Sequence, residues 1–254
     1  MRRRRMCCMP LPHISPLAYI GDGVELGADV VIGPGAVILG PAVIEDGAWI
    51  GPGAQIGAPP EMSNLHQNAA WAGELEHSGV RIGAGAVIRE NAVIHQGSYR
   101  ETTVGAGCWI LARAYVAHDV LIGEGTTVSA GVSIGGHCVI GPRVNIGMNA
   151  SIHQRRIIGA GAMVGMGTPV ARDVPPYAKA FGSPARLRGL NTIGMQRFGI
   201  DDAEVSLLQD RYASGDLLLD APLALAAASP LAADLEWWRS QEDRRPLQPT
   251  VESA

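Results

Sequence analysis

A six-residue period runs through most of the 254-residue chain and constrains its fold more than any other feature. An aliphatic residue recurs at every sixth position in runs of seven, three and twelve hexads, which begin at Ile20, Ile82 and Val104. The residue two positions earlier is mostly small, and glycine commonly follows the aliphatic residue. This period matches neither a helical turn of about 3.6 residues nor the alternation of a strand. It predicts short strands joined by tight corners, wound into a parallel β-helix with the aliphatic residues inside.

The composition agrees with a narrow, regular interior and argues against several classes of partner. Aromatic residues make up only 5% of the chain, so aliphatic residues and alanine must fill the core. The net charge of −4 gives no case for nucleic-acid or membrane binding, and no apolar run reaches the roughly 18 residues that span a bilayer. We interpret the arginines at 2–5 as a solvated terminus, and we expect a cytoplasmic protein.

Two breaks in the repeat, residues 58–80 and 96–103, are predicted loops. The prism is expected over residues 1–188, and a helical domain over 189–254. In that domain, Asp201 and the Ser229-Pro230 pair are expected to begin helices.

The hexads resemble those of the hexapeptide acyltransferases, whose fold is a left-handed parallel β-helix. This resemblance implies that three hexads complete one coil, so residues 18 apart lie on the same side. It also implies a homotrimer with active sites between neighbouring prisms.

Four of the seven histidines then fall in one column, when the extra residues after Ile94 are allowed for. These four residues are His95, His118, His137 and His153. An outward column of imidazoles has no packing role in one prism, so we expect it to line a cleft. Zinc sites of the γ-carbonic-anhydrase type would show a His-x4-His spacing, which is absent, and so we expect no metal. A neutral imidazole can instead act as a general base.

Several stretches resemble the acyl-[acyl-carrier-protein]–UDP-N-acetylglucosamine O-acyltransferases of lipid A synthesis more closely than they resemble other hexapeptide proteins. The stretches are AYVAHD, GVSIGGHCVI, NASIHQRRIIGAGAMVG, ARDVPPYAKAFG, IRENAVIHQGS and GLNTIGMQRFGI. AHD and IHQ in register are specific, whereas DVPPY occurs across many hexapeptide transferases. The resemblance covers nearly the whole chain.

The resemblance implies that His118 is the general base and that Asp119 orients its ring. Sequence alone leaves Asp119 equally well explained as a turn residue. The backbone N–H of Gly136 would stabilise the tetrahedral oxyanion. No cofactor is implied beyond the donor, an acyl-carrier-protein or CoA thioester.

The resemblance also implies binding residues for the donor and for the nucleotide-sugar acceptor. These are His95, Tyr115, His137, His153, Gln154, Met166, Asn191 and Arg197. Met166 stands where the family sets acyl-chain length, which favours a short to medium chain; as an alternative it simply fills space. Arg197 suits phosphate or pantetheine, or else is a solvated helix residue.

Departures from the family concentrate at the acceptor side. Residues 58–80 lack the Gln-Asp pair that holds the glucosamine, and Tyr115 and Ile193 replace a histidine and a glutamate. We therefore expect an acyltransferase acting on a hydroxyl or amine of UDP-N-acetylglucosamine or a relative. Two alternatives remain open at this point, an acetyl-CoA-dependent sugar acetyltransferase and a metal-binding trimer of carbonic-anhydrase type.

Overall fold

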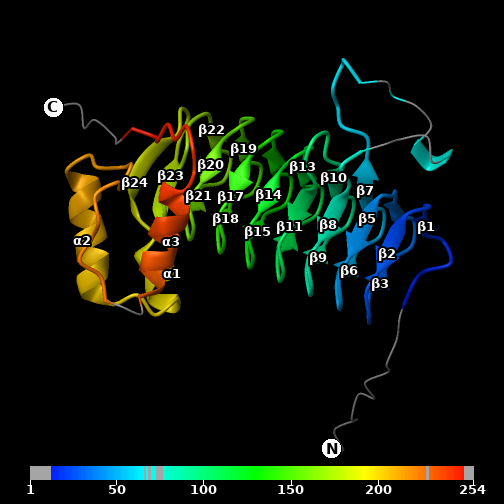
Figure 1. Cartoon of the computed structure of the whole chain (residues 1–254), viewed down its shortest axis with the longest axis horizontal. Helices are drawn as coiled ribbons and strands as arrows, with labels where there is room; N and C mark the ends of the chain where they lie inside the picture. Colours follow the sequence, from blue (N-terminus) through cyan, green and yellow to red (C-terminus); the bar gives the residue numbers. More distant parts are fainter. Residues whose placement is uncertain (1–12, 66, 68–69, 73–76, 227–228, 249–254) are drawn as a thin grey trace, which may run out of the picture.

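The computed structural model describes residues 13–65, 67, 70–72, 77–226 and 229–248. The chain forms a left-handed parallel β-helix, a long prism with three parallel sheets as its sides, and helices lie at its C-terminal end (Figure 1). Each predicted hexad forms one short strand, β1 to β22, so the predicted fold class is confirmed. The arginines at 2–5 lie outside the described residues.

From β1 to β22 the three sheets contain every third strand in turn, as expected for three strands per coil. The first sheet consists of β1 (Tyr19–Ile20), β4 (Val37–Ile38), β7 (Gln55–Ala58), β10 (Val93–His95), β13 (Tyr115–Val116), β16 (Ser133–Ile134), β19 (Ser151–Ile152) and β22 (Pro169–Val170). The second consists of β2 (Val24–Leu26), β5 (Ala42–Ile44), β8 (Val80–Ile82), β11 (Thr102–Val104), β14 (Leu121–Ile122), β17 (Val139–Ile140) and β20 (Ile157–Ile158). The third consists of β3 (Val31–Ile32), β6 (Trp49–Ile50), β9 (Val87–Ile88), β12 (Trp109–Ile110), β15 (Thr127–Val128), β18 (Asn145–Ile146), β21 (Met163–Val164), β23 (Ala178–Phe181) and β24 (Arg186–Leu190).

Strand pairing fixes the column in which the histidines lie. Val116 pairs with Ile134, and Ile134 pairs with Ile152, so the 18-residue register holds. Ile94 pairs with Val116 across the extra residues of the second loop. Backbone N–H groups of each coil donate to carbonyls of the next, for example Tyr115 N to Val132 O at 2.8 Å.

The core of the prism consists of the aliphatic and small side chains of the repeat, stacked from coil to coil. Ile94, Val116 and Ile134 are fully buried, as are the small residues Ala92 and Ala114 two positions earlier in their hexads. Burying one such aliphatic side chain stabilises the fold by about 1.5–3 kcal/mol.

The corners use left-handed backbone conformations, mostly at glycines such as Gly23 (φ 71°) and Gly47 (φ 67°). Asp119 (φ 61°) and His137 (φ 63°) occupy the same corner position three residues after the buried aliphatic residue. That conformation costs most L-residues roughly 1–2 kcal/mol, and aspartate tolerates it better than most. Asp119 is therefore a turn residue, as one of the two interpretations held.

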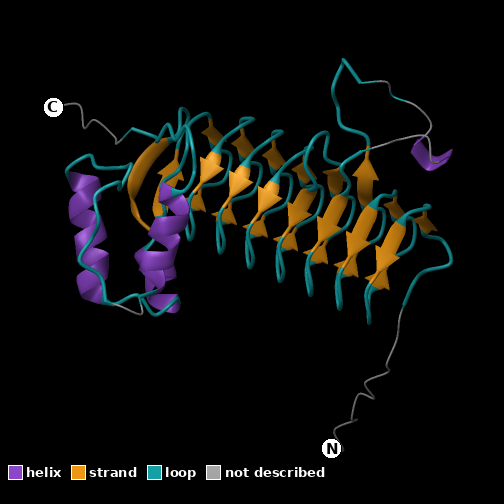
Figure 2. Ribbon diagram, in the orientation of Figure 1, coloured by secondary structure: helices purple, strands orange, loops and turns teal. Residues whose placement is uncertain are grey.

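Two loops interrupt the solenoid (Figure 2). The first connects β7 to β8 and contains a short 3-10 helix, Ala70–Ala72. The second connects β10 to β11 and is shorter than predicted, because Thr102 and Thr103 already belong to β11.

The C-terminal region adds three helices, α1 (Thr192–Arg197), α2 (Asp202–Ala213) and α3 (Pro230–Arg239). Asp201 and Ser229 are the N-caps of α2 and α3, as predicted. The expected boundary between residues 188 and 189 falls inside β24, which pairs antiparallel with β23. No helix among the described residues has the length and apolar character needed to cross a membrane.

Ile146 and its neighbour Asn145 test the inward packing, because one is fully buried and the other exposed on the same strand. We expect Ile146→Ala to lower the free energy of unfolding by about 2–5 kcal/mol. Asn145→Ala should change it by less than about 0.5 kcal/mol. Urea unfolding followed by circular dichroism measures both, and equal losses would contradict the packing described.

Candidate active site

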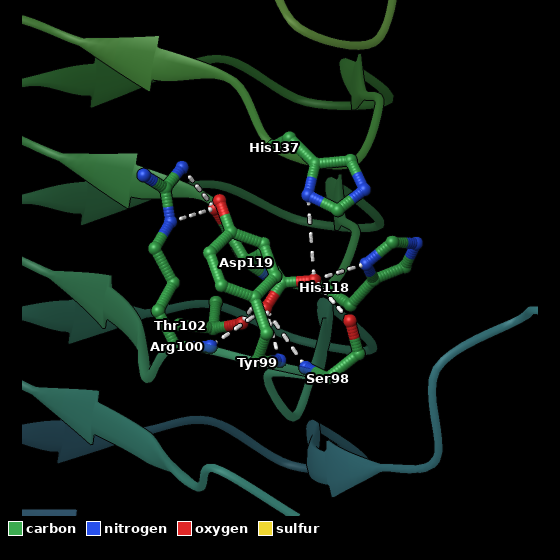
Figure 3. Close-up of polar contacts among 7 residues, drawn as sticks. All are labelled: Ser98, Tyr99, Arg100, Thr102, His118, Asp119 and His137. Atoms are coloured by element: carbon green, nitrogen blue, oxygen red, sulfur yellow. Dashed lines mark hydrogen bonds and ion pairs between the residues drawn. The ribbon is translucent and has the colours of Figure 1, made fainter.

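A hydrogen-bonded His–Asp pair occupies the corner that follows β13. His118 Nδ1 lies 2.6 Å from Asp119 Oδ2, and Asp119 is fully buried. Because an ionised carboxylate only accepts hydrogen bonds, Nδ1 carries the hydrogen and Nε2 keeps a free lone pair. Figure 3 shows Nε2 pointing away from Asp119.

The loop between β10 and β11 surrounds the Asp119 carboxylate with donors (Figure 3). Oδ1 accepts the backbone N–H groups of Ser98, Tyr99 and Arg100 at 2.8, 3.0 and 3.2 Å. The Ser98 hydroxyl donates to Oδ2 at 2.6 Å. The insertion thus forms a cradle that holds both oxygens of Asp119, and Oδ2 is shared with His118.

The cradle keeps Asp119 ionised. Burial alone raises the pKa of this carboxyl, but hydrogen bonds from Ser98, His118 and the loop backbone outweigh it and hold the pKa well below its usual range. The Asp119 backbone is held as well, since Thr102 Oγ1 accepts its N–H at 2.8 Å and Arg100 Nε donates to its carbonyl at 2.8 Å.

His137 lies one coil further along, against the pair. Its ring meets that of His118 edge to face, with centroids 4.8 Å apart, and stacks on Tyr99 at 5.5 Å. Its Nδ1 is 3.5 Å from Asp119 Oδ2. Burial and the nearby Arg155 guanidinium lower its pKa, so His137 is kept neutral.

His95 lies one coil before the pair and is only 4% exposed, contrary to the outward position expected. The irregular register after Ile94 accounts for this, since His95 extends β10 and pairs with Ala58 where the strand bulges. Its ring meets that of Tyr115 edge to face at 5.1 Å. The Tyr115 hydroxyl in turn donates to Glu61 Oε2 at 3.0 Å.

His153 is exposed, and its Nδ1 lies 3.1 Å from the carbonyl of Gln154. Both residues line an open groove of about 390 Å³ on the first sheet. The groove is mostly apolar and ends at Tyr115, with Ser133, Ser151 and Pro169 along its length.

Gly136 packs directly against the His118 ring. A Cβ on Gly136 would lie 2.7 Å from Cε1 and 2.8 Å from Nε2 of that imidazole. Only glycine therefore leaves room for the ring in this position. Its backbone is next to the free nitrogen, where the sequence resemblance placed an oxyanion donor.

Three predicted binding residues lie elsewhere in the chain. Asn191 is the N-cap of α1, accepting from Gly194 N and donating to Gly161 O. Arg197 is in the last turn of α1, and Met166 is 71% exposed after β21. Their described contacts within one chain include no member of the His118 cluster.

One ligand atom each from His118, Asp119 and His137 lies within 4.8 Å of the others, a distance at which a cation could be held. However, His118 Nδ1 already bonds Asp119, and both Asp119 oxygens accept loop donors. These hydrogen bonds leave His118 with one free ring nitrogen beside an ionised carboxylate, an arrangement that fits acid–base chemistry.

Sequence reasoning missed the residues that hold the site together. Ser98, Tyr99, Arg100 and Glu61 belong to loops without periodicity. The only available signal was the position of the insertion, directly before the coil that carries His118.

Fold and site together define a hexapeptide-repeat β-helix protein with a His–Asp pair suited to proton transfer. A family described as "Bacterial transferase hexapeptide (six repeats)" matches residues 101–136, and "Udp N-acetylglucosamine O-acyltransferase; Domain 2" matches residues 173–228.

Individual relatives confirm the resemblance to acyl-[acyl-carrier-protein]–UDP-N-acetylglucosamine O-acyltransferases. That of Trichlorobacter lovleyi is 55% identical over 143 residues, which are 54% of this chain and 55% of that protein. That of Thermodesulfovibrio yellowstonii is 41% identical over 140 residues, 54% of each. The matches span about half the length of these curated relatives.

Solved structures of such enzymes are similar to this structure over a larger part of the chain. The UDP-N-acetylglucosamine acyltransferase from Campylobacter jejuni is 28% identical with a TM-score of 0.66, covering 82% of this chain and 85% of that one. The Arabidopsis UDP-N-acetylglucosamine acyltransferase, at 22% identity and a TM-score of 0.68, shares the fold over 92% of this chain and 97% of that one.

Ionised Asp119 should make stability depend on pH. Because its folded pKa is depressed, its contribution is present above the unfolded value of about 3.9 and is lost as pH falls through the folded pKa. Asp119→Asn should cost about 1–3 kcal/mol near neutral pH, and less in more acidic solution. Urea unfolding at several pH values measures this.

Asp22 is exposed and serves as the matched control. Asp22→Asn should leave unfolding nearly unchanged at every pH. A loss for Asp119→Asn that is constant down to about pH 2 would contradict an ionised, cradled carboxylate.

Proposed function

We propose that the protein is an acyltransferase that moves an acyl chain from a carrier-protein or CoA thioester to UDP-N-acetylglucosamine or a related nucleotide-sugar. The observation that carries this proposal is the oriented His118–Asp119 pair, whose Nε2 is free. Tyr115, three residues before His118, lines an apolar groove on the same sheet. Similarity to the named acyltransferases supports the substrate classes.

In the proposed reaction, His118 Nε2 takes the proton from the acceptor hydroxyl as its oxygen attacks the thioester carbonyl carbon. Asp119 stabilises the resulting imidazolium. The Gly136 N–H donates to the oxyanion of the tetrahedral intermediate. Collapse breaks the carbon–sulfur bond, and the imidazolium returns its proton to the departing thiolate.

The apolar groove suits the donor. Ser133, Ser151 and Pro169 present small side chains on consecutive coils, which leaves space for a chain lying along the prism. His153 and Gln154 stand at its side, where they could contact the thioester arm.

A homotrimer would complete this site. Trp109, Met148 and Met166 are 49%, 49% and 71% exposed, and all follow or lie in strands of the third sheet. Large exposed apolar residues on the side formed by the third sheet favour contact with another copy. In the trimer this side closes the neighbour's groove, and Met166 limits the length of the acyl chain there.

His118→Ala tests the proposed base. General-base catalysis contributes about 10²–10⁴-fold, so we expect turnover to fall by at least that range. The assay is mass spectrometry of acylated nucleotide-sugar with carrier-protein and CoA donors. The control is His13→Ala, which changes an exposed histidine near the start of the chain and should keep full activity. A His118→Ala protein with more than a tenth of wild-type turnover would rule out this base.

Gly136→Ala tests the space around the imidazole while it preserves the backbone N–H. The added Cβ meets the His118 ring, so kcat should fall by about tenfold or more with little loss of stability. Gly21→Ala is the control, because a Cβ there meets its nearest atom at 3.4 Å. Unchanged kcat for Gly136→Ala would show that the ring is not held where the structure places it.

A further inference from the structure

The Ser98 hydroxyl contacts the His118–Asp119 pair in a way that the proposed mechanism leaves unused. Ser98 donates twice to the same carboxylate, through its backbone N–H to Asp119 Oδ1 at 2.8 Å and through its hydroxyl to Oδ2 at 2.6 Å. The two residues are 21 positions apart in sequence, and the insertion after β10 places them side by side (Figure 3). Ser98 therefore reaches both oxygens of the group that orients His118.

The two oxygens of Asp119 have different neighbours. Oδ1 accepts three backbone N–H groups, those of Ser98, Tyr99 and Arg100. Oδ2 accepts the Ser98 hydroxyl and the Nδ1 hydrogen of His118, each at 2.6 Å. The backbone donors at Oδ1 are sufficient to hold the carboxylate in place. The hydroxyl acts on the other oxygen, which faces His118.

The direction of the hydroxyl bond follows from the charge of Asp119. Burial raises the pKa of this carboxyl, but hydrogen bonds led by that of Ser98 lower it well below its usual range, so the group is ionised. Because an ionised carboxylate only accepts hydrogen bonds, the Ser98 hydroxyl must be the donor. Such charge-assisted bonds are short and strong. This bond neutralises part of the charge on Oδ2 and leaves less of it to attract a proton on His118.

The remaining charged or titratable groups around the pair lie on neighbouring coils and loops. They are His95, His137, Glu61, Arg100 and Arg155. His137 Nδ1 is 3.5 Å from Oδ2 and has no hydrogen-bond partner among the described residues. Arg100 Nε donates to the backbone carbonyl of Asp119, not to its carboxylate. Within the described part of the chain, Ser98 is thus the one side chain besides His118 that hydrogen-bonds the carboxylate.

We propose that Ser98 is a positioning residue for the proposed acyl transfer, whose hydroxyl shares Asp119 Oδ2 with His118 and so limits the proton affinity of the ring that acts as the base. This inference rests on the proposed function. Without the hydroxyl, Oδ2 faces the His118 ring with more of its negative charge. That charge favours the imidazolium, in which the Nε2 lone pair is no longer free to take a proton from the acceptor.

Loss of the hydroxyl should move the pH dependence of the reaction in one direction. A general base acts when its ring is neutral, so kcat/KM falls on the acid side as the ring takes up a proton. A more negative Oδ2 in Ser98→Ala stabilises the imidazolium, and we expect the acid limb to lie about 0.5–1 pH unit higher. At about pH 8.5, kcat/KM should stay within about twofold of wild type, because three N–H groups still hold the carboxylate.

The experiment measures kcat/KM from about pH 5.5 to about pH 9 in wild type, Ser98→Ala and Ser98→Thr. The substrates are UDP-N-acetylglucosamine and an acylated carrier protein. Ser98→Thr keeps the hydroxyl, and its acid limb should coincide with that of wild type. Ser206→Ala is the matched control, because it removes an exposed hydroxyl that donates to the carbonyl of Asp202 at 2.8 Å within α2. It should not move the limb.

Nitrogen-15 NMR titration of the His118 ring gives a second readout that needs no turnover. The pH midpoint of its resonances should rise by about 0.5–1 unit in Ser98→Ala and stay unchanged in Ser98→Thr. If wild type acylates no nucleotide-sugar, the proposed function fails, and this titration alone decides the role of Ser98. Should Ser98→Ala not fold, Ser98→Cys replaces it, since its S–H is a weak donor and should give a shift of the same sign.

A purely structural role for the hydroxyl would lower kcat/KM equally at every pH and leave both the acid limb and the NMR midpoint in place. That result would overturn the inference. A shift to lower pH would contradict it as well, and so would equal shifts in Ser98→Ala and Ser98→Thr, or a limb that moves without the His118 midpoint.

Discussion

Stacking of coils at a fixed 18-residue register is the constraint on which the rest of the molecule depends. Each inward aliphatic residue packs on those of the coils above and below it, and each strand satisfies the backbone of its neighbours. A shift of one residue would turn the aliphatic side chains outward. Residues far apart in sequence are therefore held at neighbouring corners, and proton transfer needs reacting groups in a defined relative position.

The site arises where the repeat is modified. Asp119 and His137 occupy corner positions that glycine fills in many other coils, and they accept a left-handed backbone there. The insertion before β11 supplies N–H donors that ionise Asp119, and Gly136 leaves the space into which the His118 ring fits. The cost of the strained corners is offset by hydrogen bonds that a regular coil does not make.

The repeat made the solenoid predictable, because its period is a property of the sequence itself. The histidine column was predictable only with the family resemblance, which implies three hexads per coil. The N-cap of α2 at Asp201 was also predictable, because capping depends on the side chains of neighbouring residues alone. The cradle from Ser98 to Arg100 was not predictable, because its N–H groups belong to the backbone of an aperiodic loop. Nor were the burial of His95, which depends on a register shift, or the pairing of Glu61 with Tyr115 across 54 residues.

The central claim is that the scaffold holds His118 with its hydrogen on Nδ1 and its Nε2 free. Nitrogen-15 NMR of histidine-labelled protein measures this directly, with the His118 signals assigned by their loss in the alanine variant. The account predicts that the neutral ring carries its hydrogen on Nδ1, with an unprotonated Nε2 resonance. A neutral His118 ring protonated at Nε2, or an equal mixture of the two tautomers, would contradict it.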